Sequence, residues 1–122
     1  MNILIVEDNP GDILLLKTAL SESSYHDAVV KYASTIEQSK EHTSSNIELV
    51  LVDLGLPDSD GLDTVMAINE LYSESAIIVL TGMHDEQIAI HSLREGAQNY
   101  LNKSELSGPV IDRTIRYSFE RH

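Results

Sequence analysis

Five short apolar runs, each followed by a longer segment with helical spacing, limit the fold of this chain more than any other feature. The runs are rich in branched residues and bounded by turn formers. They predict strands at residues 2–6, 28–33, 48–52, 76–80 and 99–101. The segments that follow predict helices at residues 11–23, 35–44, 62–73, 84–95 and 106–120. Near-continuous apolar strands joined by helical crossovers predict an α/β fold with a parallel sheet covered on both faces.

The length and charge of the chain narrow the prediction further. A chain of 122 residues fits one domain, and we expect a single domain over residues 1–122 with no output domain in it. Twenty acidic against eight basic side chains give a formal net charge of −12, which repels phosphate backbones and anionic lipid. We therefore expect neither direct nucleic-acid binding nor membrane binding.

The cysteine content and the start of the chain indicate where the domain works. The sequence has no cysteine, which excludes disulfides and thiolate chemistry. The apolar run at residues 3–6 has no basic segment before it and no cleavage pattern after it, so we expect a cytoplasmic location. The sequence alone leaves open whether this is a whole protein or one domain of a longer one.

Acidic, hydroxyl and amino side chains follow four of the predicted strands. Glu7 and Asp8 come after the first, Asp53 after the third, Thr81 after the fourth and Lys103 after the fifth. The carboxyl ends of parallel strands meet at one edge of a sheet, with neighbouring ends about 5 Å apart, and ligands bind beyond this edge. We therefore expect these five side chains to converge.

Three carboxylates at such spacing favour metal-assisted phosphoryl transfer. Each pair repels by roughly 3 kcal/mol at an effective dielectric constant near 20, so the group either has raised pKa values or holds a divalent cation. With only oxygen ligands on offer, Mg²⁺ is the natural ion and Mn²⁺ the alternative. An ionised Asp53 could attack a phosphoryl group and form an acyl phosphate. The Lys103 ammonium, the Thr81 hydroxyl and backbone N–H groups near Gly82 could stabilise the phosphoryl oxygens.

Four motifs follow one another along the chain: "LIVEDNPGD", "LVLVDLGLPDSDGL", "IIVLTG" and "NYLNK". In order and spacing they resemble the receiver domains of two-component response regulators, over all 122 residues. The resemblance implies a flavodoxin-like, doubly wound (βα)5 parallel sheet with strand order 2-1-3-4-5. It also implies a phosphoacceptor signalling domain, not a true enzyme, whose phosphoryl group comes from a histidine kinase or a histidine phosphotransfer protein.

The resemblance implies a role for each residue of the predicted metal site. Glu7 and Asp8 match the acidic pair that binds Mg²⁺, although many family members carry aspartate in place of Glu7. Asp53 matches the phosphoacceptor, and the carbonyl of Gly55 completes the metal ligands. Gly55 and Met83 occupy positions that gate the water that hydrolyses the acyl phosphate, and neither offers a side-chain base. We expect self-dephosphorylation to be set by access of water.

Three more residues match the catalytic and switching positions of the family. Thr81 matches the switch hydroxyl, Lys103 the lysine that assists catalysis, and Tyr100 the aromatic residue that rotates. The resemblance implies that phosphorylation draws in the Thr81 hydroxyl and lets Tyr100 turn inward. An output domain or partner is then expected to bind the face built from the fourth helix, the fifth strand and the fifth helix.

Two features near the end of the chain lead to narrower expectations. Ser104 follows Lys103 where the family usually has a proline in a cis peptide, so we expect a trans peptide bond here. Arg113, Arg116 and Arg121 stand out in an acidic chain. They could interact with the helix dipole or pair with acidic residues of a second copy, which leaves a homodimer open.

Two other functions were weighed against the receiver hypothesis. A haloacid-dehalogenase-like phosphohydrolase also uses Mg²⁺ and a nucleophilic aspartate, but that family has a second aspartate where this chain has Gly55. A receiver-like scaffold that no longer takes phosphate would not need Asp53, Thr81 and Lys103, all of which this chain retains.

The remaining aspartates of the third motif have a simpler interpretation. In "LPDSDG", Asp58, Asp60 and Gly61 are the residue types that a turn requires. We expect them to shape the turn and to cap a helix, and their substitution to lower stability more than phosphorylation.

Overall fold

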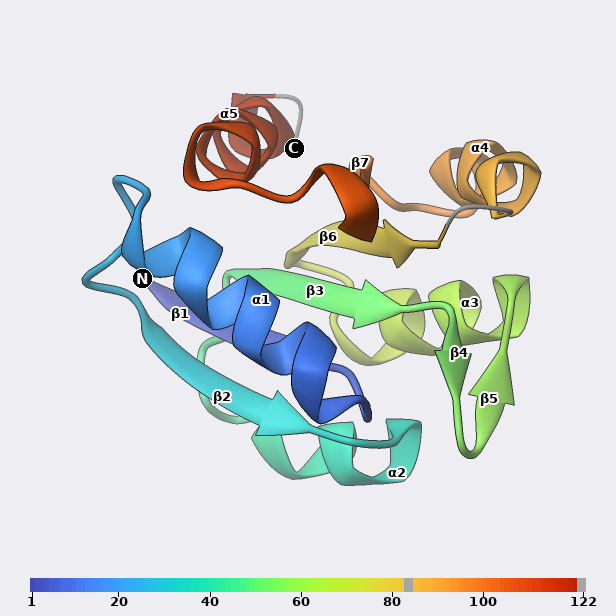
Figure 1. Ribbon diagram of the computed structural model, residues 1–122. Coiled ribbons are helices and arrows are strands. Elements are labelled where there is room, and N and C mark those ends of the chain that lie inside the picture. Colours follow the sequence, from blue (N-terminus) through green and yellow to red (C-terminus); the bar gives the residue numbers. More distant parts are fainter. Residues whose placement is uncertain (83–84, 121–122) are drawn as a thin grey trace.

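The computed structural model describes residues 1–82 and 85–120, and it contains one five-stranded parallel sheet (Figure 1). The sheet order is β2-β1-β3-β6-β7, and all four neighbouring pairs are parallel. These strands are β1 (Asn2–Val6), β2 (Val29–Ala33), β3 (Leu49–Asp53), β6 (Ala76–Thr81) and β7 (Asn99–Asn102). Counting only these five, the order is 2-1-3-4-5, so the predicted flavodoxin-like α/β fold is confirmed.

Helices cover both faces of the sheet, as Figure 1 shows. Helices α1 (Pro10–Ser21) and α5 (Gly108–Glu120) pack together on one face. The other face carries α2 (Ile36–Ser39), α3 (Leu62–Leu71) and α4 (Glu86–Arg94). The topology therefore places the end of each strand and the start of the helix after it at the same edge of the sheet.

The three central strands explain why the apolar runs are nearly continuous. In β3, Leu49 and Leu51 pack toward α1 and α5, whereas Val50 and Val52 pack toward α2 and α3. All four side chains are completely buried. Successive residues of a strand point to opposite faces, so a strand covered on both sides needs apolar residues at every position.

The predicted second helix, at residues 35–44, is wrong in length. Helix α2 has a single turn, and the 3-10 helix η1 (Lys40–His42) follows it. Thr35 caps α2, since its side chain accepts a hydrogen bond from the Gln38 backbone N–H at 3.0 Å. The segment offers little apolar surface beyond Ile36, and packing of an apolar face is what stabilises most helices in proteins.

A small hairpin that the sequence did not predict occupies the turn after β3. Strands β4 (Gly55–Leu56) and β5 (Ser59–Asp60) pair antiparallel there. At its tip, the Asp58 carboxylate accepts hydrogen bonds from the backbone N–H groups of Ile36 at 3.0 Å and Glu37 at 3.1 Å. The expected cap role is confirmed for Asp58, and the helix that it caps is α2. Asp60 lies in β5, and α3, which follows Gly61, has no side-chain cap. Gly61, which precedes α3, has φ +58° and ψ −135°, a conformation that favours glycine.

The last helix also begins later than predicted. The 3-10 helix η2 (Lys103–Glu105) follows β7, and α5 starts at Gly108, beside the end of α1. A Cβ at Gly108 would come within 2.8 Å of the Glu22 carbonyl oxygen, so glycine allows this close approach. The Lys103–Ser104 peptide bond is trans, as expected. Within residues 1–82 and 85–120, no helix has the length and apolar character needed to cross a membrane.

Candidate functional site

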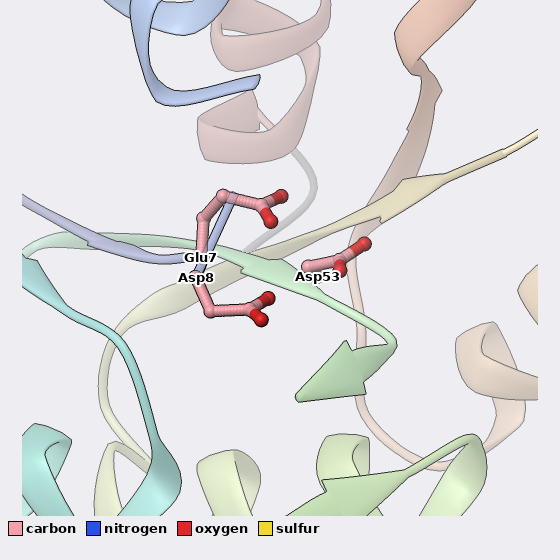
Figure 2. Close-up of side chains that lie close together, drawn as sticks. All are labelled: Glu7, Asp8 and Asp53. Atoms are coloured by element: carbon pink, nitrogen blue, oxygen red, sulfur yellow. The ribbon is translucent and has the colours of Figure 1, made fainter. Parts of the chain in front are cut away.

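Three carboxylates meet at the carboxyl end of the sheet. Glu7 and Asp8 follow β1, and Asp53 ends β3, the strand beside it. One carboxylate oxygen of each lies within 4.8 Å of the others, and Figure 2 shows Glu7 and Asp8 pointing toward Asp53. The predicted convergence of these side chains is therefore confirmed. It follows from the pairing of β1 with β3, because adjacent parallel strands end side by side.

Burial differs sharply among the three carboxylates. Glu7 is buried, Asp53 is partly buried and Asp8 is exposed. Burial raises the pKa of Glu7, and Lys103 opposes this shift. Burial also raises the pKa of Asp53, with Lys103 again opposing and Asp12 and Asp8 adding to the rise. The site thus holds more negative charge than the lysine alone balances.

Lys103 contacts three carboxylates at once. Its Nζ lies 2.9 Å from Glu7 Oε2, 2.8 Å from Asp12 Oδ2 and 2.9 Å from Asp53 Oδ1. Burial lowers the pKa of Lys103, but its contacts with Asp12, Asp53 and Glu7 outweigh this, so the net pKa is raised. The ammonium stays charged throughout the neutral range.

Sequence reasoning missed Asp12. The residue lies in the first turn of α1, not at the end of a strand. The convergence of parallel strand ends, which predicted the other carboxylates, therefore did not predict Asp12. The available signal was the third acidic residue of "EDNPGD", four positions after Asp8 and in the first turn of the helix that follows.

The Glu7 carboxylate supports a cation site among these residues. Its Oε1 accepts a hydrogen bond from the Asn9 backbone N–H at 3.1 Å. Its Oε2 lies 2.9 Å from Lys103 Nζ, but the angles do not make this ionic contact a hydrogen bond, and no other described group bonds to this buried oxygen. A buried carboxylate oxygen without a hydrogen bond, beside two more carboxylates, fits a hard divalent cation such as Mg²⁺ or Mn²⁺.

The remaining predicted metal ligand, Gly55, lies two residues beyond Asp53. It is the first residue of β4, and its backbone is exposed. A Cβ built there meets no atom within 4 Å, so glycine is not required by space. Metal binding by its carbonyl stays a prediction.

Thr81 and Tyr100 line one cavity near this site. Thr81 ends β6 and is only 2 % exposed, and its hydroxyl donates a 3.4 Å hydrogen bond to the Leu101 carbonyl. Tyr100 lies half-buried on β7, opposite Val79, on the face that carries α3 and α4. Together with α5 residues that include Arg113, they line a cavity of about 330 Å³. The switching roles of Thr81 and Tyr100 stay predictions.

One predicted donor is already engaged. Backbone N–H groups near Gly82 are expected to hold a phosphoryl oxygen, and the N–H of Gly82 itself donates to Asp85 Oδ2 at 2.9 Å. Asp85 must therefore release this N–H before a phosphoryl oxygen can use it. Met83, expected to gate the hydrolytic water, lies outside the described residues.

The arginines of the last helix have different surroundings. Arg116 pairs with Asp112 of its own helix at 3.3 Å, and Arg113 is exposed. Arg121 lies outside the described residues. Pairing of these arginines with a second copy stays a prediction.

A family model for the response regulator receiver domain matches residues 3–113. The chain belongs to this family, whose members are phosphoacceptors in two-component signalling and not true enzymes. Receiver domains bind Mg²⁺, which agrees with the cluster of Glu7, Asp8 and Asp53.

Relatives of known function and a solved structure agree with this assignment. The chain is 33 % identical over 122 residues to the KDP operon transcriptional regulatory protein KdpE of Escherichia coli, covering 99 % of this chain and 52 % of KdpE. It is 36 % identical over 104 residues to transcriptional regulatory protein KdpE of Staphylococcus aureus, covering 83 % and 42 %. A receiver domain protein from Clostridium thermocellum superimposes with a TM-score of 0.81 at 26 % identity, covering 98 % and 94 %. The chain thus spans about half or less of the two regulators.

Proposed function

We propose that this domain accepts a phosphoryl group on Asp53 and passes the signal on by changing what it binds. The donor is a histidine kinase or a histidine phosphotransfer protein, as membership of a two-component family implies. Mg²⁺, or Mn²⁺ in its place, is held by Glu7, Asp8, Asp53 and the Gly55 carbonyl. The observation that carries the proposal is the partly buried Asp53 carboxylate, which lies 2.9 Å from the Lys103 ammonium and within 4.8 Å of carboxylate oxygens of Glu7 and Asp8.

In the proposed reaction, an oxygen of Asp53 attacks the phosphorus of a phosphohistidine. The new P–O bond gives an acyl phosphate, the P–N bond breaks, and the departing imidazole nitrogen takes a proton from solvent. Bound Mg²⁺ supplies positive charge to the phosphoryl oxygens. The Lys103 ammonium lies 2.9 Å from Asp53 Oδ1, close enough to pair with a phosphoryl oxygen as well. Positioning and charge thus carry most of the catalysis.

Phosphorylation is proposed to act on the cavity beside Thr81 and Tyr100. The Thr81 hydroxyl leaves its long, 3.4 Å hydrogen bond to Leu101 and turns to a phosphoryl oxygen. Tyr100 then moves inward, which alters the surface of α4, β7 and α5. That surface is proposed to bind an output domain, a partner protein or a second copy of the chain. We also propose that residues 1–122 form one receiver domain and work in the cytoplasm.

Intact mass spectrometry after incubation with acetyl phosphate and Mg²⁺ tests the phosphoacceptor proposal. We expect one added phosphate that hydroxylamine removes, and no added phosphate in Asp53→Asn. An Asp60→Asn protein is the control, because it changes an exposed aspartate of the same loop. Rapid turnover of many phosphate esters would support a hydrolase. No adduct on the wild-type chain would support a scaffold.

A further inference from the structure

Asp12 contacts the site, yet the proposed phosphoryl transfer gives it no role. Its Oδ2 accepts a hydrogen bond from Lys103 Nζ at 2.8 Å, across 91 positions of the sequence. An acidic residue in a first helical turn is common, because it interacts favourably with the helix dipole. The dipole does not require a lysine partner, however, so this contact needs another explanation.

A closed ring of contacts fixes Asp12 relative to the metal site. The Glu7 carboxylate accepts the Asn9 backbone N–H at 3.1 Å, and Asn9 Oδ1 accepts the Asp12 backbone N–H at 3.1 Å. Asp12 accepts from Lys103, and Lys103 Nζ returns to Glu7 Oε2 at 2.9 Å. Each member of the ring thus limits where the ammonium can lie.

Three carboxylates surround the ammonium, although its contact with Glu7 is not a hydrogen bond. Lys103 carries three N–H donors and meets the oxygens of Glu7, Asp12 and Asp53. A phosphoryl oxygen arriving at Asp53 needs one of these donors. The side chain of Glu7 is 1 % exposed, that of Asp53 15 % and that of Asp12 27 %, so water solvates Asp12 most readily once its contact is lost. The bond to Asp12 is therefore the cheapest one to break.

We propose that Asp12 is a positioning residue for Lys103. Before phosphorylation its contact with Nζ balances those of Glu7 and Asp53, so that the ammonium is not held by these two carboxylates alone, whose oxygens the divalent cation needs. When a phosphoryl group arrives, the ammonium transfers from Asp12 to a phosphoryl oxygen. This inference rests on the proposed phosphoacceptor function, because it assigns how the lysine is shared in that site.

Mg²⁺ titration of Asp12→Asn by calorimetry gives the first test. The variant loses one negative charge near the ion and leaves the ammonium to Glu7 and Asp53 alone, the two carboxylates that the ion needs. We expect the Mg²⁺ dissociation constant to rise about three- to tenfold. Asp12→Glu, which keeps the charge, should recover most of the affinity. Asp63→Asn is the matched control, because it removes an exposed carboxylate from the first turn of α3, and it should change the constant less than about twofold.

The ¹⁵N and ¹H resonances of the Lys103 ammonium give the second test, which a merely structural role would not satisfy. We expect them to shift in Asp12→Asn, to return toward wild type in Asp12→Glu and to stay unchanged in Asp63→Asn. With Mg²⁺ and beryllofluoride, a phosphoryl mimic, the wild-type and Asp12→Asn resonances should converge, because the ammonium then has the same partners in both.

The outcomes of these tests distinguish the proposed role of Asp12 from the proposed phosphoacceptor function. Unchanged Mg²⁺ affinity together with unchanged ammonium resonances in Asp12→Asn would overturn the positioning role. A difference between the two proteins that persists with beryllofluoride would overturn the transfer of the lysine. If the wild-type protein binds no Mg²⁺, the proposed phosphoacceptor function fails, while the ammonium resonances still decide the role of Asp12.

Discussion

Glu7 shows how a single buried side chain connects folding to the chemistry of the site. It is 1 % exposed, and its pKa is raised mainly because burial disfavours the charged form. In the metal-free protein the ionised carboxylate therefore opposes folding. A bound divalent cation would remove this penalty, so the site is built to be stable with the ion and less stable without it.

Glu7→Gln should stabilise the metal-free protein at neutral pH by about 1 kcal/mol, because the amide carries no charge. The raised pKa means that the folded state binds more protons than the unfolded state above pH 4.5, the ordinary value for glutamate. Stability of the metal-free wild type should therefore fall as pH rises from that value through the raised pKa of Glu7. Urea unfolding at several pH values measures this slope.

The same unfolding experiment with added Mg²⁺ measures how much the bound ion stabilises the fold. An ion at a hundredfold its dissociation constant stabilises a fold by about 2.7 kcal/mol, and Glu7→Gln should lose most of this gain. Glu70→Gln, an exposed change on α3, should behave as wild type in both respects. A Glu7→Gln protein whose stability without metal falls as steeply with pH as the wild type would contradict this account of the buried carboxylate.

The sequence predicted which side chains meet, but not which bonds they form. Glu7, Asp8 and Asp53 follow buried strands, and parallel topology alone brings strand ends together. The contact of Lys103 with Asp12 depends on how the first turn of α1 faces the loop after β7, and no periodicity in the sequence encodes that orientation.

At the scale of elements, local patterns predicted the strands better than the short connections. The central strands are apolar at nearly every position because both faces of the sheet are covered, and these continuous apolar runs predict the strands from the sequence. Helix α2 and the β4–β5 hairpin are short and depend on tertiary contacts, such as the cap that Asp58 provides from a different loop. Their lengths could not be predicted from local propensity.

Asp58→Ala should destabilise the protein by about 1 kcal/mol, because the backbone N–H groups of Ile36 and Glu37 in the first turn of α2 lose their acceptor. Thr35 still caps the helix in this variant. Partial burial raises the pKa of Asp58, but the backbone N–H groups of Ile36 and Glu37 outweigh it and leave the pKa below its ordinary value. The stabilising effect should thus vanish as pH falls through that lowered pKa. Chemical unfolding measures both effects, with Asp60→Ala as the control in the same hairpin.

Phosphorylation of Asp58→Ala by acetyl phosphate and Mg²⁺ should proceed at close to the wild-type rate. The Asp58 carboxylate bonds to the first turn of α2 and is not one of the three clustered carboxylates, Glu7, Asp8 and Asp53. A variant that folds but phosphorylates tenfold more slowly would show that the hairpin also positions the metal site.

Thr81→Ala should leave phosphorylation intact but weaken the change at α4 and β7, because no hydroxyl is left to follow the phosphoryl oxygen. Backbone amide spectra recorded with and without Mg²⁺ and beryllofluoride measure that change at Tyr100 and along α4. Ser118→Ala is the control, since it removes a buried hydroxyl that bonds within α5. If the amide shifts of Thr81→Ala match those of the wild type, the coupling through Thr81 is wrong.

At the scale of the whole molecule, the carboxylate cluster and the proposed binding surface lie on different elements. The carboxylates lie at the carboxyl ends of β1 and β3, whereas Tyr100, α4 and α5 form the neighbouring surface. The chain spans 52 % of the Escherichia coli regulator KdpE and 42 % of the Staphylococcus aureus protein.

The central claim is that Asp53 takes the phosphoryl group, and chemical mapping of the modified residue tests it most directly. Borohydride reduces an acyl phosphate of aspartate to homoserine, which peptide sequencing by mass spectrometry can locate. After treatment with acetyl phosphate and Mg²⁺, we expect homoserine at position 53, and none when Mg²⁺ is removed by a chelator. Reduction at Asp8 or Asp12 in place of Asp53, or no reduced residue at all, would contradict the account.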